Sequence, residues 1–326
     1  MPQELVKESD NMQKQIVKII KEKAIFLVLI AMVLFFSIVT RTFLTVDNLF
    51  NVARQVSMLG IASIGMTFVI LLGGIDLSTG SIITFVNIIT AYMMVNMGMN
   101  MWPAILLTLA MCTLIGLFNG FAVATFHMPP LIVTFATQTI FAGVAYMISG
   151  GMPISGLPET FAVIGQGYMG VVPVPVIIMI FAFAVGGVIL NKTYFGRYFY
   201  ALGGNEEAAE LSGIKVKNIK MLVFALSGLF GGIAGIVMLS RTNSGQATAG
   251  RGYEFDVITA VVLGGVSLSG GSGKMLNVVA GVLILGVLSN GMVLMNVSSY
   301  AQMVIKGIIL LLAVGFDCVQ KKGLVK

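Results

Sequence analysis

Residues that could carry out chemistry are few in this chain, and they do not group together. His127 is the only histidine, and no cysteine or second histidine stands near it at metal-ligand spacing. Cys112 and Cys318 fall inside or at the end of apolar stretches, where packing is the expected role. Residues 270–274, GGSGK, superficially resemble a phosphate-binding loop but lack its G-x-x-x-x-G-K-[ST] spacing. We therefore expect no catalytic residue, no metal ligand and no cofactor.

Polar side chains inside apolar stretches could bind a solute instead. A polar solute needs hydrogen-bonding groups along its route, because burying its hydroxyl groups unpaired is costly. The amides that could line such a route, or equally bond between helices, are Asn87, Asn119, Gln138 and Asn290. Asp76 is the carboxylate deepest in the apolar sequence. A charge at mid-bilayer costs about 2.5–3.5 kcal/mol, so we expect Asp76 either to act in function or to cap a helix.

The composition is that of an integral membrane protein. The 326 residues are 57% hydrophobic and only 10% charged, with a mean hydropathy of +1.00. These values exclude a soluble enzyme, a nucleic-acid reader and a receptor with a single membrane anchor. Runs such as residues 24–39 are continuously apolar, whereas the strands of membrane β-barrels alternate. The sequence therefore predicts an all-α integral membrane protein.

Apolar runs between proline, glycine and charged residues predict about ten transmembrane helices. The candidate spans are residues 24–40, 52–72, 77–97, 103–126, 131–149, 173–190, 221–239, 255–269, 275–295 and 300–317. Most basic residues then fall on one side, which marks that side as cytoplasmic. The cytoplasmic parts are a tail at 1–23, a loop at 191–220 and a tail at 321–326, and residues 24–320 form one polytopic domain. Lys306, near the start of the last span, is expected to snorkel to the outer interface rather than pair with an interior carboxylate.

One segment of the chain occurs twice. Residues 72–81 read LGGIDLSTGS and residues 263–272 read LGGVSLSGGS, identical at seven of ten positions. Paired glycine-interrupted segments often mark broken helices beside the pathway of a transporter. The residues expected at these breaks are Gly73, Gly74, Asp76 and Ser78 in the first copy and Gly264, Gly265, Ser267 and Ser269 in the second. Ten spans would make the repeat parallel, unless the 52–72 or the 255–269 segment is re-entrant.

The second copy bears on the role of Asp76. Ser267 stands where the first copy has Asp76, and both residue types can cap a helix after a glycine break. Capping is therefore the favoured role of Asp76, with direct involvement in transport as the alternative. On this interpretation Asp76→Ser is expected to retain transport.

The cytoplasmic loop predicts a short, exposed helix. Its residues are Asn205, Glu206, Glu207, Ala208, Ala209 and Gly213. The asparagine is a good N-cap, the two glutamates favour the first turn, and the glycine suits the left-handed residue after the last turn. The two small alanines could fit a groove on a cytoplasmic partner and transmit force. The alternative is a solvated connecting helix.

These residues also carry a family resemblance. The pattern Glu207-Ala208-Ala209-x-x-x-Gly213 resembles the EAA coupling motif of permeases in ATP-binding cassette importers. The stretches ALGGNEEAAELSGIKVKNIK, TAGRGYEFDVITAVVLGGVSLSGGSGK and VSSYAQMVIKGIILLLAV resemble ribose-type monosaccharide permeases, and the likeness covers nearly the whole chain. The resemblance implies a homodimeric pore in the bacterial plasma membrane, with both termini cytoplasmic, that moves ribose or a related sugar inward. It also implies separate ATPase subunits, which bind residues 205–213, an extracytoplasmic sugar-binding protein and no catalysis by this chain.

Two other functions stay open at this point. One is a permease of the same superfamily for a different polar solute, such as a branched-chain amino acid or a furanosyl signalling compound. The other is a secondary transporter coupled to H⁺ or Na⁺, for which Asp76 is the main candidate as the ion-binding carboxylate.

Two further segments carry packing predictions. The small residues Gly228, Gly231, Gly232 and Gly235 predict a close helix contact. Residues 157–160 predict the start of a short helix in an outer loop, with proline at its first position.

Overall fold

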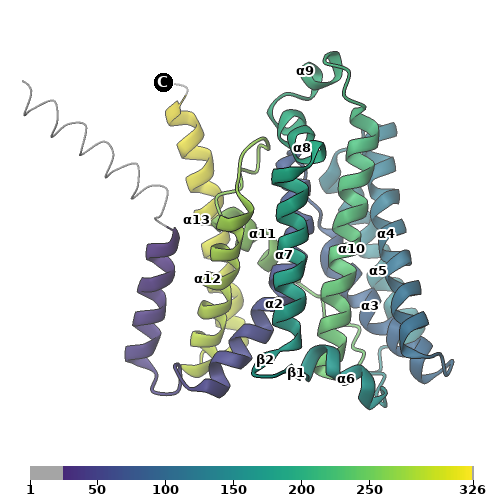
Figure 1. The fold of residues 1–326 in the computed structure, drawn as a ribbon, viewed down its shortest axis with the longest axis vertical. Helices are drawn as coiled ribbons and strands as arrows, with labels where there is room; N and C mark the ends of the chain where they lie inside the picture. Colours follow the sequence, from purple (N-terminus) through teal and green to yellow (C-terminus); the bar gives the residue numbers. More distant parts are fainter. Residues whose placement is uncertain (1–24, 325–326) are drawn as a thin grey trace, which may run out of the picture.

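The computed structural model describes residues 25–324, which form an almost entirely helical bundle (Figure 1). This confirms the predicted fold class. The tail expected at 1–23 and residues 325 and 326 lie outside the described part of the chain. The remainder of the tail expected at 321–326 continues the last helix, which runs to Leu324.

The elements follow one another along the chain as helices with one small hairpin. They are the helix Ile25–Val39, α2 (Val46–Leu71), α3 (Ser78–Val95), α4 (Met101–Thr125), α5 (Pro130–Ser149), α6 (Glu159–Gln166), β1 (Tyr168–Met169), β2 (Val172–Pro173), α7 (Val174–Lys192), α8 (Tyr194–Gly204), α9 (Glu206–Leu211), α10 (Val216–Thr242), α11 (Tyr253–Leu263), α12 (Met275–Leu294) and α13 (Ser299–Leu324). Eight of the described helices are long and apolar enough to cross a membrane: α2, α3, α4, α5, α7, α10, α12 and α13. The helix Ile25–Val39 is apolar but shorter.

The span predicted at residues 255–269 is wrong as a continuous helix. α11 holds 11 residues and ends at Leu263. It therefore rises about 16 Å, roughly half the hydrocarbon thickness of a bilayer. The chain turns at Gly264 and at Gly265, whose φ of +74° is left-handed and favours glycine. The repeat predicts a break at Gly264 and Gly265, and the predicted span ran past it.

A non-helical segment made largely of turns, residues 243–252, precedes α11 and covers the part of the crossing that α11 does not. It leaves the end of α10 and lies along α3, where Thr84 Oγ1 accepts a hydrogen bond of 3.1 Å from Gly250 N. Residues 243–252 and α11 together pass from one end of the bundle to the other, so this segment is not re-entrant. Non-helical backbone is tolerated within a membrane domain because protein surrounds it and supplies hydrogen bonds.

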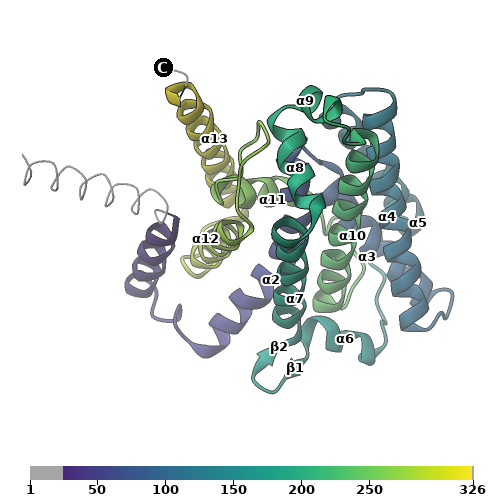
Figure 2. The same ribbon diagram turned by 45° about the horizontal axis from the view of Figure 1, so that its top comes forward.

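The centre of the bundle consists of α2, α3 and α10, whose side chains are mostly buried, while α5, α7 and α13 lie at its periphery (Figures 1 and 2). α10 contacts α4 through glycine faces on both helices. A Cβ at Gly228 would overlap Cys112 O, and one at Gly116 would overlap Phe224 O. The predicted close contact at the glycines of α10 is therefore confirmed, because only a missing side chain lets the two backbones approach this closely.

The two ends of the bundle carry different elements. α8, α9 and the end of α13 lie at one end, and α6 with the β1–β2 hairpin lies at the other (Figure 1). We call these the α9 end and the α6 end. The short helix predicted from residues 157–160 is present as α6, with Pro158 at the N-cap rather than inside the helix. The loop near residue 205 and the end of α13 share one end, as the predicted topology requires.

The glycine contact between α10 and α4 can be tested with one added carbon. We expect Gly228→Ala to destabilise the protein by about 1–3 kcal/mol, because the new Cβ must push the α4 backbone away. Thermal unfolding of the purified protein in detergent measures this loss. Gly187→Ala on α7 is the matched control, since a Cβ there would meet no heavy atom within 4 Å. Equal stability of the two variants would contradict the packing described for α10.

Candidate functional site

The first repeat copy forms a helix break, as predicted. α2 ends at Leu71, and Gly73 takes a left-handed φ of +77°. The chain then runs without helix until α3 begins at Ser78. We call residues 72–77 the first break.

Asp76 holds the first break together from inside. Its side chain is fully buried. Oδ1 accepts hydrogen bonds from the backbone N of Ser78 at 2.9 Å and from the Ser78 hydroxyl. Oδ2 accepts a hydrogen bond of 2.6 Å from the hydroxyl of Ser227 on α10. The carboxylate thus caps the start of α3 and also joins the break to α10, which fits the favoured capping role.

Neighbouring helices satisfy the remaining groups of the first break. Asn119 Nδ2 on α4 donates a hydrogen bond of 3.0 Å to the Ser78 hydroxyl. Thr134 Oγ1 on α5 donates to Ile75 O and accepts from Leu77 N, both at 3.1 Å. α5 therefore pairs backbone groups of the break, while α4 and α10 pair its polar side chains.

The second repeat copy also breaks its helix, but its carboxylate comes from elsewhere. α11 ends at Leu263, and we call residues 264–274 the second break. Ser267 Oγ donates a hydrogen bond of 3.1 Å to Oδ2 of Asp317, which lies on α13. Leu268 N donates to the same oxygen at 3.2 Å. Ser267 therefore does not cap the break alone, and the basis for expecting Asp76→Ser to retain transport is removed.

The two breaks meet at the α9 end. Gly271 N of the second break donates a hydrogen bond of 2.9 Å to Leu71 O, the last residue of α2. Ser269 O lies next to Gly73. α2 and α11 thus both run toward this end, which supports the parallel arrangement of the repeat.

The end of α8 packs against both breaks. A Cβ at Gly203 would overlap Leu71 O and Gly271 N. Tyr200 on α8 donates a hydrogen bond of 2.8 Å from its hydroxyl to Gly273 O. Two broken helices and α8 therefore touch backbone to backbone immediately before α9 begins. We call this contact the glycine junction.

α9 has the local structure that the sequence predicts. Asn205 is the N-cap, and its Oδ1 accepts a hydrogen bond of 2.9 Å from Ala208 N. Gly213 follows the helix with a left-handed φ of +84°. Glu206 forms an ion pair of 2.6 Å with Lys220 on α10, which fastens the start of α9 to the bundle.

One expectation about α9 is wrong. Ala209 was expected to face a partner, but it is buried in the protein's own apolar core. The exposed face of α9 consists of Glu207, Ala208, Glu210 and Leu211. Leu211 on this face is 85% exposed. A leucine beside acidic residues in a short polar helix is the sequence signal that could have identified the exposed face.

A cavity of about 320 Å³ opens between the first break and α9. Its lining includes glycines of the break and the Glu206–Lys220 ion pair. His127, expected to be structural, is also part of the lining and has a left-handed φ of +52°. The complete lining is Leu72, Gly73, Gly74, Val123, His127, Met128, Pro129, Pro130, Glu206, Lys220 and Phe224.

The four candidate amides are not brought together in one site. Asn290 on α12 exchanges two hydrogen bonds of 2.8 and 2.9 Å with Asn48 on α2, which joins these helices. Asn87 donates to Ile83 O on its own helix. Gln138 on α5 donates a hydrogen bond of 2.7 Å to the buried carboxylate of Glu254 on α11.

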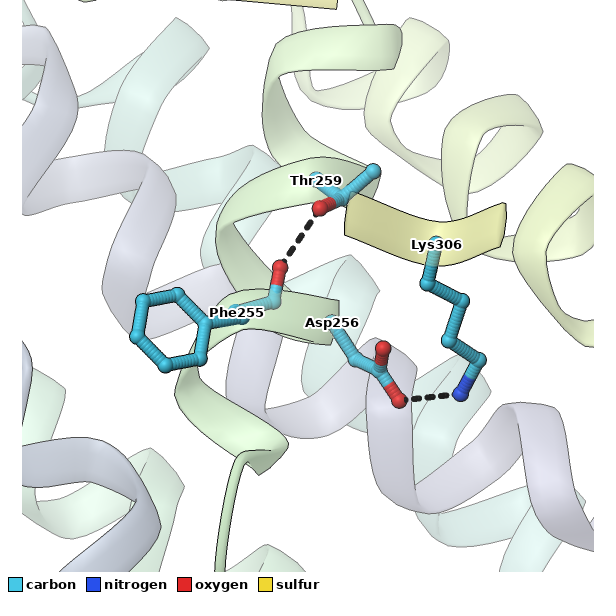
Figure 3. Close-up of polar contacts among 4 residues, drawn as sticks. All are labelled: Phe255, Asp256, Thr259 and Lys306. Atoms are coloured by element: carbon cyan, nitrogen blue, oxygen red, sulfur yellow. Dashed lines mark hydrogen bonds and ion pairs between the residues drawn. The ribbon is translucent and has the colours of Figure 1, made fainter. Parts of the chain in front are cut away.

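Lys306 does not snorkel, and this expectation is wrong. Its Nζ lies 2.6 Å from Oδ2 of Asp256 on α11, with the two side chains 25% and 22% exposed (Figure 3). In a low-dielectric interior, burying two opposite charges as an ion pair costs less free energy than burying them separately. The partner was missed because it lies 50 residues away in sequence.

Residues 48–314 match the sequence family described as branched-chain amino acid transport system / permease component. The ribose import permease protein of Bacillus subtilis (strain 168) is 45% identical over 294 residues, which cover 90% of this chain and 91% of that protein. The L-arabinose transport system permease protein of Escherichia coli (strain K12) is 41% identical over 86% of this chain and 85% of its own length.

A third relative carries a different sugar name. The xylose transport system permease protein of Haemophilus influenzae (strain ATCC 51907 / DSM 11121 / KW20 / Rd) is 34% identical over 91% of this chain and 96% of its own length. No solved structure matches the chain. The matched span and these identities show that the chain belongs to the branched-chain amino acid transport system permease component family.

Proposed function

We propose that this chain is the membrane permease of an ATP-binding cassette importer, and that it moves ribose or a related sugar into the cell. Relatives named for ribose, L-arabinose and xylose transport cover nearly the whole chain at 34–45% identity. All three names refer to pentoses. The substrate class that this pattern favours is therefore a five-carbon monosaccharide.

The observation that carries the mechanism is the connection between α9 and the two breaks. α9 is exposed at one end of the bundle, and α8 connects it directly to the glycine junction. A push on α9 reaches Leu71 and Gly271 through close backbone contacts at Gly203, with no flexible side chain between them. Closely packed interiors transmit such displacements rather than absorbing them.

The breaks are where such a displacement can change the helices. Intact helices resist bending, because every turn is hydrogen-bonded to the next. At the first and second breaks the backbone is instead paired by side chains of Asp76, Thr134 and Asp317. These bonds can be exchanged without unwinding a helix. We infer that the breaks act as hinges that open and close the sugar pathway.

The two ends of the bundle bind different partner proteins. ATPase subunits bind α9 from the cytoplasm, and an extracytoplasmic sugar-binding protein docks at the α6 end. A second copy of the chain completes the pore, and ATP is hydrolysed on the ATPase subunits. The chain lies in the bacterial plasma membrane with both termini in the cytoplasm. The distribution of lysine and arginine supports this orientation.

Two of the candidate amides have side-chain oxygens with which a sugar hydroxyl could pair. The Oδ1 atoms of Asn87 and Asn119 are buried and have no hydrogen-bond partner among residues 25–319. A buried carbonyl oxygen without a donor costs about 1–3 kcal/mol. A passing sugar hydroxyl would supply that donor. We propose Asn87, Asn119 and Gln138 as pathway residues.

The substrate assignment is tested by uptake. The permease, co-expressed with its ATPase and its sugar-binding protein, is expected to restore ribose uptake to cells that lack their own pentose importers. Unlabelled L-arabinose and xylose should compete with labelled ribose more strongly than leucine does. Uptake of leucine without uptake of any pentose would contradict the sugar assignment and favour the amino acid alternative.

The contact made by α9 is tested by enlarging its exposed face. We expect Ala208→Trp to lower ribose uptake and ATPase co-purification by about tenfold or more, the factor that corresponds to about 1.4 kcal/mol of lost contact energy. Asn218→Trp, on the exposed first turn of α10, is the matched control. Ala209→Trp is a poorer test, because its side chain would have to enter the protein's own core. Wild-type uptake by Ala208→Trp would make α9 a passive connector.

A further inference from the structure

α13 is attached to the rest of the protein in an unusual way. Most of its apolar side chains, such as Leu311 and Phe316, are exposed. Its membrane-spanning part, Ser299–Val319, is the least buried of the eight long helices. α13 nevertheless makes two polar contacts with a neighbour: Lys306 contacts Asp256, and Asp317 contacts the second break.

The two contacts form a regular pair. Lys306 and Asp317 are 11 residues apart, as are their partners Asp256 and Ser267. Eleven residues make close to three turns of an α-helix, so Lys306 and Asp317 lie on one face of α13. α13 therefore runs parallel to α11 and contacts both the start of α11 and the break that follows its end. Figure 3 shows the contact between Lys306 and Asp256.

The contact of Asp317 with the second break supplies the carboxylate that the second repeat copy lacks. In the first break a carboxylate within the copy, Asp76, accepts a backbone N–H and two hydroxyl groups. In the second break the equivalent position is Ser267, and the accepting carboxylate is Asp317 from α13. The donors differ by one residue along the copies, Ser78 N in the first and Leu268 N in the second. Both breaks nevertheless end with a carboxylate on a backbone N–H and a serine hydroxyl.

We propose that Asp317 is a positioning residue for transport, which supplies to the second break the carboxylate that Asp76 supplies to the first. The second break bonds to Leu71 O and packs on α8, so Asp317 acts on the glycine junction through this break. The Lys306–Asp256 ion pair holds the other end of α11, and α13 moves with α11 as one unit. This inference rests on the proposed transport function.

The test exchanges the two side chains. Asp317→Ser removes the carboxylate, and Ser267→Asp adds one at the position that the first copy uses. The double variant Ser267→Asp/Asp317→Ser keeps one carboxylate but moves it from α13 to the break. Ribose uptake, and the number of ATP molecules hydrolysed per sugar moved, are measured for each variant with its ATPase in proteoliposomes. Asp47→Ser, an exposed aspartate at the start of α2, is the matched control.

We expect Asp317→Ser to lower uptake by about tenfold or more, because the variant loses the charged group that accepts two hydrogen bonds from the second break. The number of ATP molecules hydrolysed per sugar should rise, because the second break is no longer held in place against the glycine junction. Ser267→Asp alone should also lose uptake, since it places two carboxylates together. The double variant should recover most of the wild-type uptake, because the two residues contact each other and the effects of their substitutions therefore do not simply add. Rescue of this kind requires a carboxylate at the break and not merely a packed α13.

Two results would overturn the proposal. One is Asp317→Ser with wild-type uptake and wild-type ATP use per sugar. The other is a double variant that is no better than Asp317→Ser. A wild-type protein that takes up no pentose would refute the proposed function instead. The thermal unfolding midpoints of the four forms in detergent would then still test the carboxylate contact, with the same order expected.

The ion pair gives an independent measurement on the same helix. Asp256→Asn and Lys306→Gln each leave one charge unpaired in the bundle, so each should lower the yield of folded protein. Asp256→Asn/Lys306→Gln removes both charges and should recover most of that yield, as for other ion pairs in low-dielectric surroundings. A double variant that is worse than either single variant would show that the pair does not act as a clamp.

Discussion

The structure depends on one constraint: interrupted backbone inside a membrane bundle must still find hydrogen-bond partners. Two glycine-containing segments stop helices within the bundle, and each stop exposes N–H and C=O groups that water would satisfy in a soluble protein. Here Asp76, Thr134 and Asp317 do so instead. Thr134 and Asp317 come from α5 and α13, and Asp76 connects its break to α10. The need to pair broken backbone is therefore also what binds the helices around each break.

Glycine has a second role where the breaks meet. Gly203 lies where any side chain would collide with the backbone of Leu71 and Gly271. The contact resembles the small-residue packing of α10 against α4, but it joins three segments rather than two. α9 begins three residues after Gly203, with Asn205 as its cap. An exposed helix is thereby placed on the most closely packed part of the α9 end.

Local signals in the sequence were sufficient for much of this description. Asn205, Gly213 and the paired glycines of the repeat act on their own backbone, so their types predicted the cap and the two breaks correctly. The predicted spans agree with the eight long helices for the same reason, since apolar length is a local property. The errors concern contacts between distant residues. Lys306 and Ser267 gave no indication that Asp256 and Asp317 lie beside them, and the orientation of Ala209 depends on how α8 and α10 support α9. The span predicted at residues 255–269 ran into the second break, although Gly264 and Gly265 mark it in the repeat.

The short length of α11 has a consequence for how the protein enters the membrane. α11 carries Glu254 and Asp256 on 11 residues, and each carboxylate costs about 2.5–3.5 kcal/mol at the centre of a lone inserting helix. The positive charge that neutralises Asp256 is Lys306, made by the ribosome 50 residues later. Eleven residues are also too few to cross unaided. α11 must therefore wait at the translocon or the membrane surface until α13 emerges, and the part of the chain from α11 onward inserts as a group rather than helix by helix.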